Sequence, residues 1–157
     1  MNKLLFVVLM VFPGLVPVNL HAAQQDAAGC KSHPLAPAMP GYFISACSSD
    51  DGVADFEVLK GKFTETVHVE GKSAAILYSP QPDLKSKPTE AGLKADFDKV
   101  ITKQGGTLVS ATPGQKWPVY KLTKDGKEFW IVLMVDGGQY FTGSYAVRVI
   151  EQNRQKR

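Results

Sequence analysis

The two cysteines are the residues of this chain whose chemistry is easiest to assign. Cys30 and Cys47 are the only cysteines, and they stand 17 positions apart. Two cysteines in an exported protein usually form a disulfide, and closing a loop of this size stabilises by ~3 kcal/mol in the chain-entropy model. Zinc is the alternative, but it takes four nitrogen or sulfur ligands. Cys30, His33 and Cys47 supply three, and His68 is an unsupported fourth. We therefore expect a disulfide, with no metal and no cofactor.

Other residues that carry chemistry do not assemble into a catalytic pattern. Ser144 lacks the Gly-x-Ser-x-Gly frame of a nucleophile elbow, and the glycines form neither a GxGxxG motif nor a phosphate loop. Asp96 and Asp98 are two positions apart on an expected helix, so their side chains do not share a face. No partner is visible for either His33 or His68. The sequence thus predicts that the protein is not an enzyme and has no catalytic residues.

The first 22 residues have the layout of a secretory signal peptide. Lys3 gives a positive start, residues 4–18 are mostly apolar, and small residues follow at a suitable cleavage position. Prolines interrupt this run, and it is shorter than the ~20 apolar residues that a membrane span needs. Cleavage after Ala22 would remove 22 of the 157 residues and leave 135, which we expect to form a single domain over residues 23–157. Residues 27–30 also resemble a lipobox, so lipidation of Cys30 stays open.

The net charge of the chain and its expected location limit the kinds of partner that it can bind. The formal net charge is +3, and this count includes Lys3 of the signal. So small a charge argues against nucleic-acid binding, and we interpret the basic tail, residues 154–157, as a solvated end. We expect a periplasmic protein associated with the outer membrane, without a transmembrane span in the mature chain.

The first half of the expected domain is an irregular arm followed by strands. Residues 23–41, here called the arm, are rich in alanine, glycine, proline and serine. Alternating apolar and polar residues then predict short strands, with a turn at residues 70–72. The expected strands are residues 42–46, 54–59, 63–69 and 73–78.

One helix should follow a proline-bounded break at residues 80–88. Thr89 can cap it, and Glu90 lies in the first turn, where the helix dipole favours an acid. An apolar stripe of helical period then continues to a glycine pair at residues 105–106, which is typical of a helix end. The stripe consists of Leu93, Phe97, Val100 and Ile101.

The last third of the chain predicts an antiparallel meander, with strands at residues 107–111, 117–123, 127–135 and 139–150. Asp125-Gly126 is a strong tight-hairpin signal, and residues 136–138 form a second turn. Residues 129–135 are apolar on both faces, so this strand should be central. The helix can cover one face. The arm, a partner (including a second copy) or a ligand would cover the other. The expected fold is therefore an α+β domain: an antiparallel sheet, one main helix packed on a face, and an N-terminal arm pinned by the disulfide.

Several segments together resemble a module of bacterial OmpA-family envelope proteins. Residues 26–35 resemble a D-x-x-G-C/S-x-D-H-P opening, and residues 39–47 resemble R/M-x-P-G-Y/F-x-I with a second cysteine. Residues 69–72, 101–109 and 121–132 are similar to its V-E-G-K, I-x-x-x-G-G-x-x-V and L-T-K-D-G-K-E-x-W-V segments. The resemblance implies a fold and an envelope location, and leaves the module's activity open.

This chain departs from the family pattern in two ways. Ser32 stands where the family usually has aspartate, and we do not expect the C-terminal peptidoglycan-binding domain that follows this module in the family. Direct peptidoglycan binding is therefore not supported, and no binding residue is carried over. We expect a non-enzymatic envelope binding or adaptor module whose partner is an envelope protein or a second copy. The candidate contact residues are His33, Tyr42, Trp117 and Tyr120. An inhibitor or immunity-type protein that inserts its disulfide-held loop, residues 31–46, is the alternative, and a small hydrolase is the third hypothesis.

Overall fold

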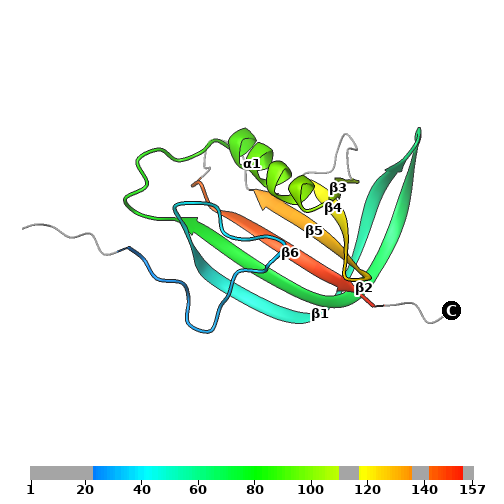
Figure 1. The fold of residues 1–157 in the computed structure, drawn as a ribbon, viewed down its shortest axis with the longest axis horizontal. Coiled ribbons are helices and arrows are strands. Elements are labelled where there is room, and N and C mark those ends of the chain that lie inside the picture. The colour runs from blue at the N-terminus through cyan, green and yellow to red at the C-terminus, as the bar shows by residue number, and fades with distance from the viewer. Residues whose placement is uncertain (1–22, 110–116, 136–141, 154–157) are drawn as a thin grey trace, which may run out of the picture.

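The computed structural model describes residues 23–109, 117–135 and 142–153. In these ranges the chain forms one antiparallel sheet of six strands and a single helix (Figure 1). The strand order is β1-β2-β6-β5-β4-β3. The elements are β1 (Tyr42–Lys60), β2 (Phe63–Pro80), α1 (Glu90–Lys103), β3 (Thr107–Leu108), β4 (Val119–Lys124), β5 (Lys127–Val135) and β6 (Tyr145–Gln152). The expected antiparallel sheet and helix are confirmed, although the structure is mostly β. The predicted signal peptide, the turn at 136–138 and the basic tail lie outside the described residues.

The prediction of four short strands before the helix is wrong. β1 and β2 are two long strands, paired without interruption except for one register shift between Ile44 and Ala46. The expected turn at residues 70–72 lies inside β2, and the real turn is the two-residue loop Gly61-Lys62. Gly61 has φ +67°, and a glycine at the first loop position is typical of a type II′ hairpin.

Gly71 was misleading because a strand glycine can serve a close backbone approach as well as a turn. It pairs with Gly52 of β1 on one side and with Gln152 of β6 on the other. A Cβ atom at Gly71 would lie 1.9 Å from the carbonyl oxygen of Glu151. Only glycine lets the backbones of β2 and β6 come this close.

β5 is a central strand with both faces buried, as predicted. On one face Ile131 and Leu133 pack with the α1 residues Leu93, Phe97 and Ile101, and with Leu35 and Ala36 of the arm. On the other face Trp130 and Val132 pack with Phe56, Val69, Val119 and Ile150. The arm therefore covers the same face as the helix, and the outer part of the β1–β2 hairpin covers the opposite one. Figure 1 shows this hairpin bending away from the line of the other strands.

The bend brings the two outermost strands of the sheet together at one corner. The amide of Leu59 on β1 donates to the carbonyl oxygen of Val109, just after β3, at 3.0 Å. The amide of Val109 in turn donates to the carbonyl oxygen of Val119 on β4 at 2.9 Å. The sheet is thus closed on itself at this corner, although its strands do not form a complete barrel.

The helix and the last described hairpin form where the sequence predicts them. Thr89 caps α1, because its side-chain oxygen accepts from the amide of Gly92 at 3.1 Å. Gly105, with φ +87°, follows the last turn. Asp125 and Gly126 both have positive φ, as a type I′ turn requires. In the described part of the chain, no helix has the length and apolar character needed to cross a membrane.

Candidate functional site

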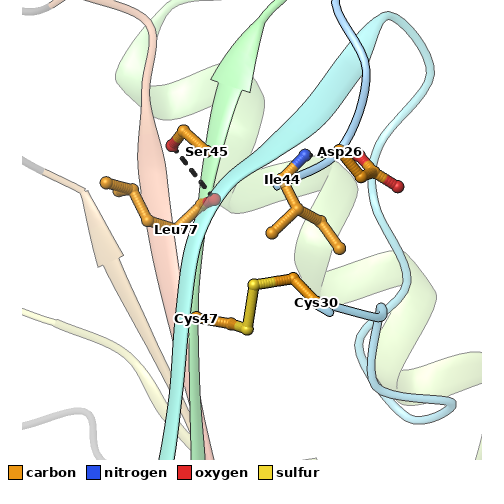
Figure 2. The surroundings of a disulfide bond; sticks show 6 residues. All are labelled: Asp26, Cys30, Ile44, Ser45, Cys47 and Leu77. Carbon is orange, nitrogen blue, oxygen red and sulfur yellow. Dashed lines mark hydrogen bonds between the residues drawn. A yellow bond between two sulfur atoms is a disulfide. The ribbon is translucent and has the colours of Figure 1, made fainter. Parts of the chain in front are cut away.

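The arm is joined to β1 by the predicted disulfide. Cys30 and Cys47 are bonded, with 5.8 Å between their Cα atoms (Figure 2). Because both sulfurs take part in this bond, the structure has no free thiol on Cys30 for lipidation. The amide of Ala27 donates to the carbonyl oxygen of Ile44 at 2.7 Å, and the amide of Ile44 donates to the Asp26 carboxylate at 2.6 Å. The arm therefore occupies the outer edge of β1 beside the disulfide.

Two tyrosines hold the arm on the helix-covered face. The Tyr78 hydroxyl donates to the carbonyl oxygen of Ala36 at 3.0 Å, and the Tyr145 hydroxyl accepts from the amide of Met39 at 3.0 Å. The rings of Tyr78 and Tyr145 stack with centroids 4.9 Å apart. Burial raises the pKa of both hydroxyls. These residues are structural anchors for the arm.

Tyr42 lines a groove between the arm and α1. Its hydroxyl donates to the carbonyl oxygen of Gly143 at 2.8 Å, and its ring contacts Tyr145 edge-on. The groove has a volume of about 510 Å³ and is mainly apolar, with Met39, Leu93 and Phe97 among its walls. Tyr42 therefore lies at a surface hollow.

His33 and Tyr120 lie elsewhere, and neither has a catalytic arrangement. His33 is half-buried near the Phe129 ring, and its Nδ1 accepts from the amide of Leu35 at 3.2 Å. Burial lowers the pKa of His33, against a smaller opposite effect of Glu151. Tyr120 is only 2% exposed and packs against Phe97. Tyr120 is a core residue and takes no part in the function proposed below.

His68 has acidic partners that the sequence did not reveal. Its Nδ1 lies 2.6 Å from an oxygen of Asp55, directly opposite on β1, and its Nε2 lies 3.0 Å from an oxygen of Glu70. The hydrogen bond with Asp55, followed by that with Glu70, raises the pKa of His68. All three side chains are on an exposed strand surface. No group of histidines, cysteines and acids within the described ranges could hold a metal ion.

Trp117 lines a second hollow, here called the inner pocket, on the face opposite the helix. Its lining residues are Asp55, Phe56, Trp117, Val119, Val132, Met134 and Arg148. The bent β1–β2 hairpin forms one wall, and β4, β5 and β6 form the rest. Trp117 therefore does not meet Tyr42 or His33, since the sheet separates their faces. Sequence reasoning missed Arg148, although a lone cation in the apolar run at residues 145–150 was a usable signal.

The outer edge of β1 is a further feature that the sequence analysis missed. In an antiparallel ladder, both backbone groups of a residue point to the same side, and successive residues alternate. Leu59 points outward, so the backbone groups of Ser49, Asp51, Val53, Asp55 and Glu57 point outward too. The described residues offer none of these groups a hydrogen-bond partner. We call residues 49–57 the free edge. Residues 49–53 were not assigned to a strand, because serine, aspartate and glycine are typical of turns.

Comparisons with family models, with curated proteins and with solved structures found no match to this chain.

Proposed function

We propose that this protein is an exported, non-enzymatic adaptor of the bacterial cell envelope, which binds an extended segment of another envelope protein along the free edge of β1. The observation that carries this proposal is the row of outward backbone groups between Cys47 and Leu59. An exposed strand edge is a template for adding a further strand. The arm already makes one backbone hydrogen bond to the same edge of β1, from the amide of Ala27 to the carbonyl oxygen of Ile44.

The free edge is long enough for specific recognition. Nine residues of extended chain span about 30 Å at ~3.3 Å per residue. Val53, which is 56% exposed, lies in the middle of the free edge and presents its side chain to solvent. A bound strand would make backbone hydrogen bonds to Asp51, Val53 and Asp55. Every second side chain of that strand would lie on the same face of the sheet as the Val53 side chain.

Charge selects the kind of segment that fits. The free edge carries four acidic residues, Asp50, Asp51, Asp55 and Glu57. In a symmetric antiparallel pairing of two copies centred on Val53, Asp51 would face Asp55 of the second copy. Directly opposed like charges destabilise a sheet. A basic extended segment is therefore favoured over a second copy.

The export pattern and the disulfide support the location. A disulfide is typical of proteins in oxidising compartments such as the periplasm, and the resemblance to OmpA-family modules implies the same envelope. No observation favours the inhibitor alternative, because Leu35 and Ala36, in the middle of the disulfide-held loop, are buried in the core.

The test uses peptides whose alternating sequence favours an extended strand. The probe is a fluorescent octapeptide of alternating lysine and valine, with anisotropy as the measurement. We expect Val53→Pro to reduce binding at least about tenfold, because proline removes an outward N–H without touching the β1–β2 ladder. Val53→Ala is the matched control, since it keeps the N–H, and it should retain most of the affinity.

Two further experiments decide what binds at the free edge. A glutamate–valine octapeptide should bind more weakly than the lysine–valine one, and N-methylation of the valines should abolish binding. Equal binding by the proline and alanine variants would contradict strand addition. If sedimentation shows a dimer that Val53→Pro dissolves, a second copy replaces the basic segment as the occupant.

A further inference from the structure

The inner pocket combines apolar walls with one cation. Phe56, Trp117, Val119, Val132 and Met134 supply the walls, and the volume is about 230 Å³. Sites for drug-sized ligands are typically ~300–1,000 Å³ and are lined mostly by apolar residues, with a few polar groups that orient the ligand. The inner pocket has this composition at a smaller size.

Arg148 is the polar group of this pocket, and the surrounding strands hold it in place. Its Nε donates to the hydroxyl of Ser73 at 3.0 Å. Ser73 is 4% exposed and lies on β2, the strand next to the β6 strand that carries Arg148. This bond uses one of the five N–H groups of the guanidinium.

No carboxylate among the described residues forms an ion pair with Arg148. Asp55, the acid that lines the pocket, has its carboxylate 2.6 Å from the His68 ring. On β5 and β6, Glu128 pairs with Lys121, and Glu151 pairs with Lys127. A guanidinium beside apolar walls, without an internal counter-ion, favours an anion supplied from outside.

Gly52 provides the space around the guanidinium. A Cβ atom at this position would lie 2.4 Å from Cβ of Ser73 and 3.1 Å from an Nη atom of Arg148. The bend of β1 over the sheet therefore depends on glycine at the place where Arg148 and Ser73 meet.

We infer that the inner pocket binds a small apolar carboxylate, with its ring or short acyl chain between Phe56 and Val132 and its carboxylate on Arg148. A bidentate carboxylate matches the planar fork of N–H groups that arginine offers. The pocket volume selects a short acyl chain or a single ring over a full-length lipid tail. This inference is independent of strand addition at the free edge, because ligand and peptide contact different atoms.

The test compares three probes of equal length on the wild-type protein: octanoate, 1-octanol and octylamine. Isothermal titration calorimetry should show octanoate binding at least about tenfold more tightly than 1-octanol, because the charge-assisted hydrogen bonds to Arg148 exist only for the carboxylate. Octylamine should bind most weakly. In NMR spectra, octanoate should shift the Nε–H signal of Arg148 and the methyl signals of Val132. The methyl signals of Val100, which lines the groove beside α1, serve as the internal control.

Two variants locate the interaction. Arg148→Met keeps an unbranched apolar stem but removes the guanidinium group, and it should remove the preference for octanoate over 1-octanol. Val132→Phe should fill the pocket and weaken both probes while leaving Arg148 intact. Thermal unfolding by circular dichroism checks that each variant is folded. Equal affinities for octanoate and 1-octanol in the wild type would overturn the inference, as would octanoate shifts confined to Val100. Val53→Pro should leave octanoate binding unchanged, so the two proposals fail separately.

Discussion

Gly52 of β1 lies directly opposite Gly71 of β2 in the antiparallel ladder of the long hairpin. Towards the arm, the core residues Ile76 and Tyr78 of β2 face the helix. Towards the hairpin tip, Val69 faces the opposite cluster. A Cβ atom at Gly52 would collide with Ser73, and one at Gly71 would collide with the backbone of Glu151. The two facing glycines therefore allow the close packing around this point of the ladder. Alternation along β2 places its residues on both faces, so the hairpin contributes to both clusters.

Gly71→Ala should be one of the most destabilising single changes in the protein. The added Cβ would meet the backbone oxygen of Glu151 at 1.9 Å, and backbone cannot move aside as a flexible side chain can. We expect a loss of about 3 kcal/mol or more of unfolding free energy, at the upper end for overpacking. Urea denaturation measures it. Gly105→Ala is the control, because its Cβ meets nothing within 4 Å and only its φ of +87° is strained. It should cost about 1 kcal/mol, and equal losses would disprove the close-approach explanation.

Removing the disulfide should lower stability without removing the free edge. A 17-residue separation predicts a loss of ~3 kcal/mol for the Cys30→Ala/Cys47→Ala double variant in the chain-entropy model. The measurement is urea unfolding of the variant beside the oxidised wild type. Lysine–valine peptide binding should persist, because the free edge begins beyond Cys47. If peptide binding disappears while the variant stays folded, the arm takes part in recognition.

The protonation of His68 should depend on Asp55. The pKa of His68 is raised in the folded state, first by Asp55 and then by Glu70. A raised folded pKa means that the stabilising contribution is fully present below the unfolded value of about 6.5 and is lost as the pH rises through the folded pKa. Because the group is exposed, we expect a small effect on stability. NMR titration should show a lower His68 pKa in Asp55→Asn. An unchanged pKa would mean that the pair is not formed in solution.

The cap of α1 can be tested with a conservative pair of variants. Thr89→Ala should cost about 1 kcal/mol, because the amide of Gly92 loses its acceptor. Thr89→Ser keeps the hydroxyl and should be nearly neutral. Thermal unfolding of both variants gives the comparison, and a serine variant as unstable as the alanine one would show that the threonine methyl group matters more than the cap.

The sequence predicted local features well where a residue pattern is typical of only one local structure. Thr89 as a cap, Asp125-Gly126 as a turn and the cysteine pair are all confirmed, because each depends on neighbours or on simple covalent chemistry. Gly71 was wrongly interpreted, because a turn and a close strand approach both select glycine. The second apolar face of β5 was correctly predicted, but the β1–β2 hairpin was not predicted to pack on it. The bend that brings Phe56 over Trp130 depends on long-range pairing that no local pattern encodes.

The candidate sites were harder to predict than the fold. Tyr42 and Trp117 both lie at surface hollows, but no sequence pattern indicates that the sheet separates them. Arg148 acquires its position through Ser73, which lies 75 positions away in the chain. The outward groups of Val53 belong to the backbone, so no side-chain motif marks them.

The hydrogen bond between Leu59 and Val109 has a consequence for how the molecule opens. Local unfolding usually begins at the outer strands of a sheet, where amides exchange with solvent most readily. Here the two outermost parts of the sheet hold each other, so neither can detach without breaking the contact with the other. The amide hydrogen of Leu59 should therefore exchange slowly, although it points away from β2, while that of Val53 on the same strand should exchange rapidly. Opening of this corner is a joint event of residues 50 positions apart.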